Sequence, residues 1–225
     1  MSINPQIIKA YAVNDYSYMH TLIFSGAKYT FYLILILSLP LFIESEAVLS
    51  VWLDSVPQYT NQFVRLVLID SCIISFSGTL MTSAQATGRI SMYQTVIGGF
   101  QLLNLPISFY LLKTGSEPLS VYYVSIVISL LSLFLRLFFL KWLVKLSISL
   151  FFVKVIFPAA VVTSFSIFFI WVVQYFLGSL ISNFTGEWII NTILCFIIIF
   201  FSICVVGLNK KERKYLRSKL MRYKI

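Results

Sequence analysis

Charged and amide side chains within long apolar segments are the residues of this sequence whose types and spacing could do chemistry. Arg65 and Asp70 lie in the apolar segment 63–86, with Asp70 about 10 Å from its start at ~1.5 Å per helical residue. A charge within a bilayer costs about 2.5–3.5 kcal/mol, so Asp70 must face protein or water. Small and polar residues follow at helical spacing and either pack helices closely or line a cavity: Ser71, Ser75, Gly78, Thr82 and Gln85.

The segments 92–112 and 119–140 carry polar faces of their own. In the first, Gln101 and Asn104 belong to a broad polar face, and their amides either bond between helices or line a cavity. In the second, five residues spaced i, i+3, i+7, i+10 and i+14 lie along one helical line: Tyr122, Ser125, Ser129, Ser132 and Arg136. Arg136 either faces a cavity or extends its guanidinium to the inner membrane surface.

Aligned polar faces on three neighbouring segments are what a helix bundle around a hydrated cavity would produce. Lys28 lies in the apolar segment 22–43, where its long side chain reaches either such a cavity or the inner interface. The sequence therefore proposes six residues as lining of a substrate cavity: Lys28, Arg65, Asp70, Gln101, Asn104 and Arg136.

The composition requires a membrane protein around these residues. The chain has 225 residues, of which 59% are hydrophobic and only 11% charged, and its mean hydropathy is +0.91. Too little polar surface is available to cover a water-soluble domain, which excludes a soluble enzyme, a secreted disulfide scaffold and a disordered chain. We predict an all-α, polytopic integral membrane protein with six transmembrane helices of about 20 residues each: 22–43, 63–86, 92–112, 119–140, 157–178 and 188–208.

The basic residues predict the orientation of these helices. With both termini in the cytoplasm, fifteen of the seventeen Lys and Arg residues lie in or beside the inner side, and only Arg65 and Lys113 lie outside. Eight of the fifteen lie in the tail 209–225, which we expect to contact anionic lipid headgroups and not nucleic acid. The segment 1–21 is expected to be an amphipathic cytoplasmic lead-in at the membrane surface.

The sequence lacks the patterns of the common enzyme classes. His20 is the one histidine, and no paired carboxylates occur within a short motif. The GxSxG, HExxH, P-loop and GxGxxG motifs are absent. The three cysteines lie within apolar segments, where they are small hydrophobic residues. We therefore expect no catalytic residue, no metal site and no cofactor.

Five short segments, in this order and spacing, resemble the Wzx-type polysaccharide flippases of the multidrug/oligosaccharidyl-lipid/polysaccharide exporter superfamily, closest in style to those of Bacteroides-like bacteria. They are 4–12 (NPQIIKAYA), 26–29 (GAKY), 39–41 (LPL), 84–89 (AQATGR) and 103–106 (LNLP). The resemblance implies a fold of twelve to fourteen helices in two lobes around a central cavity, of which this chain is similar to the last six.

The resemblance also implies a division of the chain. The residues 5–15 would correspond to the end of an eighth helix and the loop after it, and 22–140 would be the four-helix part of the C-terminal lobe. The residues 141–208 would hold an interfacial helix at 147–156 and two peripheral transmembrane helices, followed by the basic cytoplasmic tail. The first lobe is missing from the resemblance, so the chain is expected to need that lobe or to self-associate.

The function that the resemblance implies is translocation of undecaprenyl-diphosphate-linked oligosaccharide across the bacterial inner membrane, for surface polysaccharide or lipopolysaccharide (O-antigen) synthesis. A cationic cavity suits a diphosphate, and Lys28, Arg65 and Arg136 are the basic candidates. A cation-coupled multidrug exporter of the same superfamily would depend on buried acids, of which only Asp70 fits. A membrane enzyme such as an O-antigen polymerase would need a large outer loop, whereas the longest one here, 44–62, holds no Lys or Arg.

Overall fold

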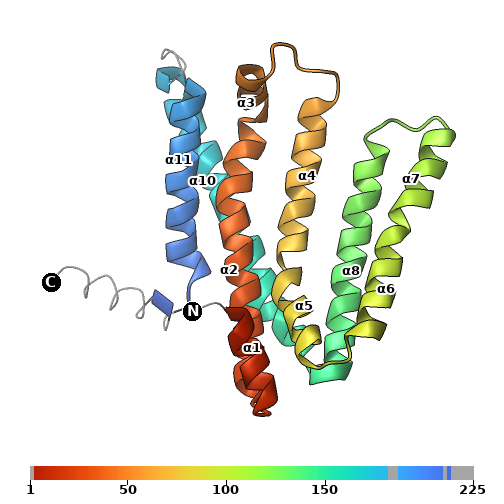
Figure 1. The fold of residues 1–225 in the computed structure, drawn as a ribbon. Coiled ribbons are helices and arrows are strands. Elements are labelled where there is room, and N and C mark those ends of the chain that lie inside the picture. Colours follow the sequence, from red (N-terminus) through yellow and green to blue (C-terminus); the bar gives the residue numbers. More distant parts are fainter. Residues whose placement is uncertain (1–2, 182–186, 210–211, 214–225) are drawn as a thin grey trace.

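The computed structural model describes residues 3–181, 187–209 and 212–213, and their side chains apart from those of 177–181 (Figure 1). Helices make up nearly all of this part of the chain, and it contains no strand. In chain order the elements are α1 (Ile3–Ala12), α2 (Tyr16–Ile43), α3 (Ser45–Trp52), α4 (Thr60–Ser75), α5 (Ser77–Ala86), α6 (Ile90–Leu102), α7 (Asn104–Lys113), α8 (Ser120–Val144), α9 (Ile148–Phe151), the π-helix η1 (Phe152–Ile156), α10 (Phe157–Ile181), α11 (Glu187–Ser202) and the π-helix η2 (Ile203–Gly207).

Six helical stretches in the described residues are long and apolar enough to cross a membrane. They are Tyr16–Ile43, Thr60–Ala86, Ile90–Lys113, Ser120–Val144, Ile148–Phe176 and Glu187–Gly207, between 21 and 29 residues long. The prediction of an all-α, multi-pass membrane protein with six spanning helices is therefore confirmed. Each stretch is longer than, or as long as, the ~20 residues that the hydrocarbon core requires.

Two of the spans consist of two helices in series. The second is divided at Phe76 between α4 and α5, and the third at Leu103 between α6 and α7. The break in the third span has a clear cause. Pro106 has no N–H to donate to the carbonyl of Leu102, and its ring crowds that turn. At the break, the Leu103 N–H instead bonds the carbonyl of Phe100 at 3.2 Å, which is a tighter i→i−3 turn.

Within the predicted lead-in 1–21, residues 3–12 form α1, which runs antiparallel to the start of α2, and α2 itself begins at Tyr16 (Figure 1). Asn14 takes a left-handed conformation in the connecting turn, and the Asp15 side chain accepts a hydrogen bond from the Tyr18 N–H at 3.0 Å, which caps α2. α1 buries Ile7 and Ala10 against α2 and α5. These two apolar side chains hold α1 against the bundle, and its place at the membrane surface stays a prediction.

The segment 147–156 is predicted to be an interfacial helix that leads into the fifth span, and residues 148–156 continue without a break into α10. Ser147 caps it by accepting a hydrogen bond from the Leu150 N–H. A π-turn follows, with the Phe157 N–H bonded to the carbonyl of Phe152, immediately before Pro158. Pro158 has no N–H, so one i→i−4 hydrogen bond of the helix cannot form there. A π-turn beside the proline accommodates this missing bond.

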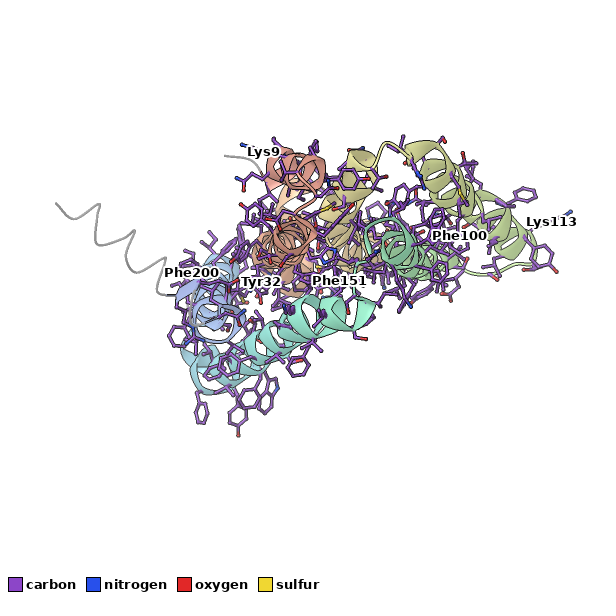
Figure 2. All side chains as sticks on the ribbon, turned by 90° about the horizontal axis from the view of Figure 1, so that it is seen from below. Lys9, Tyr32, Phe100, Lys113, Phe151 and Phe200 are labelled. Atoms are coloured by element: carbon purple, nitrogen blue, oxygen red, sulfur yellow. The ribbon has the colours of Figure 1, made fainter. Side chains whose placement is uncertain are left out.

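α2 and α8 organise the bundle. α2 packs against α1, α4, α5, α10 and α11, whereas α8 packs against α4, α5, α6 and α7. Viewed from below, Phe200 of α11 lies near one edge, Lys113 of α7 lies at the opposite edge, and Tyr32 and Phe151 lie between them (Figure 2). The fully buried side chains include Met19, Ile23, Leu80, Leu137 and Phe151, so the core lies where α1, α2, α5, α8 and the start of the fifth span meet.

Candidate functional site

Arg136 is a buried cation at the contact of α6 and α8. Its side chain is only 8% exposed, and its Nη1 donates a hydrogen bond to the hydroxyl of Tyr93 on α6 at 2.6 Å. The guanidinium carbon lies 5.7 Å from the centre of the Tyr93 ring, within the range of a cation–π interaction. Tyr93 itself is fully buried. Arg136 is therefore held between α6 and α8 by its contact with Tyr93.

The guanidinium has unused hydrogen-bonding capacity. Its Nε is buried and has no partner, and the same is true of the hydroxyl of Ser132, one turn earlier on the same face of α8. Within the described part of the chain, the one salt bridge joins Lys28 and Glu212, so no carboxylate there pairs with Arg136. Buried charges in proteins are normally paired, and this arrangement therefore provides donors for an anion.

Asp70 joins α4 to α8. The Ser125 hydroxyl donates a hydrogen bond to Asp70 Oδ2 at 3.2 Å, while Oδ1 is buried without a partner. Ser125 and Arg136 are eleven residues apart on α8, about 16 Å at ~1.5 Å per residue. The acid and the guanidinium therefore occupy two different levels of the same helix and are not direct neighbours.

The small and polar residues after Asp70 mostly satisfy their own helix. The Ser71, Ser75 and Thr82 hydroxyls donate to the backbone carbonyls of Val67, Cys72 and Gly78. Ser75 and Thr82 are buried against neighbouring helices, whereas Gly78 and Gln85 are exposed. Within this chain, the stripe therefore contributes to helix packing at its buried positions.

Arg65 stabilises the opposite end of the bundle. Its Nε donates to the hydroxyl of Ser45 on α3 at 3.0 Å, and its guanidinium lies 5.5 Å from the centre of the Phe42 ring. The Ser45 hydroxyl in turn donates to the side-chain carbonyl of Asn61. These contacts tie α3 to the start of α4, so Arg65 has structural partners in place.

The three remaining candidates lie apart from Arg136. Gln101 is exposed on α6, and Asn104 is half-buried with its side-chain carbonyl accepting from the Ser108 hydroxyl at 2.9 Å. Lys28 is 3% exposed and pairs with Glu212 at 2.8 Å. Among the described residues, no hydrogen bond or ion pair joins any two of the six candidates, and the shared hydrated cavity stays a prediction.

A groove of about 470 Å³ lies between α7 and α8, but it is not the predicted substrate cavity. Its lining is apolar or aromatic apart from Ser120, and none of the six candidates contributes to it. It includes Phe100, Leu103, Leu111, Tyr123 and Leu131. A groove of this chemistry accommodates lipid chains or another apolar surface, not a sugar or a phosphate.

Two residues of these polar contacts were missed by the sequence reasoning. Tyr93 carries the hydroxyl that holds Arg136, and nothing in its spacing within an apolar segment distinguishes it from other aromatic residues. Glu212 had a usable signal, since it is the one acid in the basic tail. Its composition marks Glu212 as a candidate for an ion pair, but does not identify which of the many cations it joins.

No protein-family model, no curated protein and no solved structure matches this chain. Its function is therefore inferred from its residues and their geometry.

Proposed function

We propose that this chain supplies one lobe of a transporter that moves undecaprenyl-diphosphate-linked oligosaccharide from the inner to the outer leaflet of the bacterial inner membrane. The observation that carries this proposal is Arg136, a buried guanidinium with an unpartnered Nε and no carboxylate partner in the described part of the chain. A guanidinium pairs with phosphate oxygens through parallel, charge-assisted hydrogen bonds. A diphosphate would supply the anionic partner that is missing beside Arg136.

The exposed polar face of α6 supports a second lobe. Gln94 and Gln101 are both exposed, although they lie in the span Ile90–Lys113. Polar side chains within a membrane usually face protein or a water-filled cavity. A first lobe placed against α6 would supply both, as in two-lobed exporters in which the substrate site lies between the repeats.

The positions of the outer elements agree with the resemblance to Wzx-type flippases. α1 lies antiparallel to α2 and packs on α5, as the end of a further lobe helix would (Figure 1). α10 and α11 pack against each other and against α2 at one edge of the bundle, as two peripheral helices would. The proposal therefore assigns α2, α4–α5, α6–α7 and α8 to the lobe itself.

The proposed orientation places both termini in the cytoplasm and the loop 53–59 outside. We expect Ser55→Cys to react with an impermeant thiol reagent in intact cells, and Ser218→Cys to react only after lysis. Both variants are made in a chain without Cys72, Cys195 and Cys204. Ser182→Cys is expected outside as well, although Ser182 and Ser218 lie outside the described residues. Labelling of position 218 in intact cells would reverse the topology.

The main alternative is a cation-coupled drug exporter of the same superfamily. Asp70 favours it, because one carboxylate oxygen is buried without a partner and the other contacts only the Ser125 hydroxyl. Such an exporter would act on cationic substrates, which a buried and unpaired Arg136 repels. Export of a cationic dye, measured beside export of glycan, separates the two functions.

The test of the proposed function is Arg136→Ala in purified chain reconstituted in lipid nanodiscs. Farnesyl diphosphate serves as a short polyprenyl-diphosphate ligand. We expect its Kd to increase at least about thirtyfold, because truncating a buried charged partner costs about 2–5 kcal/mol. Arg136→Lys keeps the charge but loses the planar guanidinium. Its Kd should lie between that of the unsubstituted chain and that of Arg136→Ala.

The matched control is Lys141→Ala, which removes an exposed cation five residues further along α8. It should leave the Kd unchanged, because an exposed charge is screened by solvent and salt. Elution as a single species from a sizing column checks that each variant is folded. Equal affinity of Arg136→Ala and the unsubstituted chain would remove Arg136 from the site and the main support from the proposal.

A further inference from the structure

The most completely paired charge in the described part of the chain is Lys28, near the middle of α2. Its side chain is only 4% exposed, and its Nζ donates to both carboxylate oxygens of Glu212 at 2.8 Å each. Glu212 follows the end of η2 by five residues, so the two partners are 184 residues apart in the sequence. This long-range pair connects the second half of the chain to the first spanning helix.

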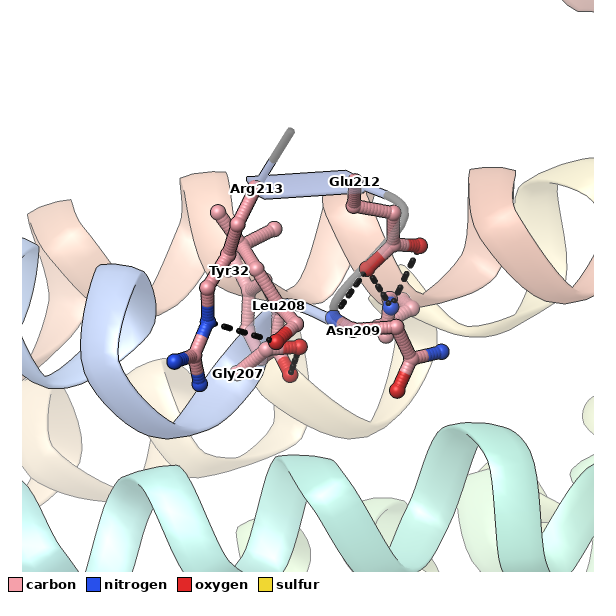
Figure 3. A network of polar contacts seen from close by, with 7 residues as sticks. Tyr32, Gly207, Leu208, Asn209, Glu212 and Arg213 are labelled. Carbon is pink, nitrogen blue, oxygen red and sulfur yellow. Dashed lines mark hydrogen bonds and ion pairs between the residues drawn. The ribbon is translucent and has the colours of Figure 1, made fainter. Parts of the chain in front are cut away.

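The residues around Glu212 complete a network that folds back on α2 (Figure 3). The Asn209 N–H donates to Glu212 Oε2 at 2.7 Å. Arg213 turns the other way, and its Nε donates to the carbonyl of Leu208 at 3.0 Å while its Nη2 donates to that of Val205. These contacts satisfy carbonyl groups that the end of η2 leaves without helical partners.

A close backbone contact lies beside this network. The Tyr32 hydroxyl donates to the carbonyl of Gly207 at 3.1 Å. A Cβ at position 207 would lie 2.9 Å from the Tyr32 ring, too close for any side chain. The glycine therefore lets the end of η2 touch α2 one turn above Lys28, which brings Glu212 within reach of the buried amine.

We propose that Gly207, Asn209, Glu212 and Arg213 form an ionic clamp that fixes the end of the sixth span to the middle of α2. Glu212 is the one acid between residues 209 and 225, among eight basic residues. A tail that acts only on anionic lipid has no use for it. Lys28, by contrast, requires a counter-ion, since a buried charge without one is strongly unfavourable.

The protonation of Glu212 agrees with this arrangement. Burial by itself raises the pKa of Glu212, but hydrogen bonds from Lys28, the Asn209 N–H and Tyr29 outweigh it, and the pKa lies below its usual range. The carboxylate is therefore ionised at neutral pH and keeps the pair with Lys28. The clamp does not depend on the proposed function, since it concerns two spans of this chain alone.

The experiment measures how firmly the sixth span is held against α2. Ile36 of α2 and the native Cys204 line the same groove between the two spans. In a chain with Cys72→Ala and Cys195→Ala, Ile36→Cys should therefore cross-link to Cys204 with a short bifunctional thiol reagent. We expect Glu212→Gln to lower the yield by roughly threefold or more, because Lys28 then lacks its counter-ion.

Two further variants show whether the effect is ionic and local. Exchanging the charges, with Lys28→Glu and Glu212→Lys together, should restore much of the yield that either reversal alone removes. Glu46→Gln is the matched control, since it makes the same change at an exposed carboxylate on α3, and it should cross-link normally. An unchanged yield for Glu212→Gln, or no recovery in the exchanged chain, would overturn the clamp.

Discussion

Residues 1–225 expressed alone should leave surface polysaccharide at background in a bacterial strain that lacks its flippase, whereas co-expression with the first lobe of a Wzx-type flippase should restore it. The reason is that alternating access requires two bodies that move against each other around a site at mid-membrane. Under the proposed function, this chain is one such body, built around α2 and α8. We expect no surface glycan above background with this chain alone, and measurable surface glycan when the first lobe is co-expressed.

The exposed amides of α6 are the reason to expect a second body. Gln94 and Gln101 would otherwise face hydrocarbon, where they have no hydrogen-bonding partners. Immunodetection of surface glycan measures the outcome, and expression of the first lobe alone is the control. If this chain alone restored the glycan, the transporter would be an assembly of identical chains and the need for a different lobe would be wrong.

Gly26→Ala should be the most disruptive single-methyl substitution in the described part of the chain. A Cβ on Gly26 would lie 2.4 Å from Thr79 Cγ2, where α2 crosses α5. Thr79 cannot rotate away without cost, since its hydroxyl donates to the carbonyl of Ile23 at 3.2 Å. Overpacking of this kind destabilises a folded protein by about 1–3 kcal/mol.

Gly99→Ala provides the matched control for this prediction. Gly99 is exposed on α6, and nothing lies within 4 Å of a Cβ placed there. The change should be neutral or stabilising by up to about 1 kcal/mol, because alanine favours a helix more than glycine does. Unfolding of the two purified variants in detergent, followed by circular dichroism, gives the comparison. Equal stability of the two variants would show that α2 and α5 do not cross closely at Gly26.

The number of spans follows from the sequence alone, whereas the first and fifth are longer in the structure, where α2 begins at Tyr16 and residues 148–156 join α10. A hydrocarbon core requires about 20 apolar residues with every backbone group bonded within its own helix, so six long apolar segments leave one secondary structure available. The break near Pro106 is also a local effect, because it follows from the N–H that proline lacks. The sequence also determines on which face of its own helix each polar residue lies.

Only the tertiary structure decided which partner each polar residue has. Arg136 bonds Tyr93, 43 residues away, and Lys28 bonds Glu212, 184 residues away. Periodicity shows which face of its own helix a residue occupies, but not which helix lies opposite. In a soluble protein hydrophobicity would separate core faces from outer faces, whereas lipid is as apolar as the protein interior and removes that distinction. The pairing of faces is therefore determined by packing and by the few hydrogen bonds between helices, which appear only when the helices are assembled.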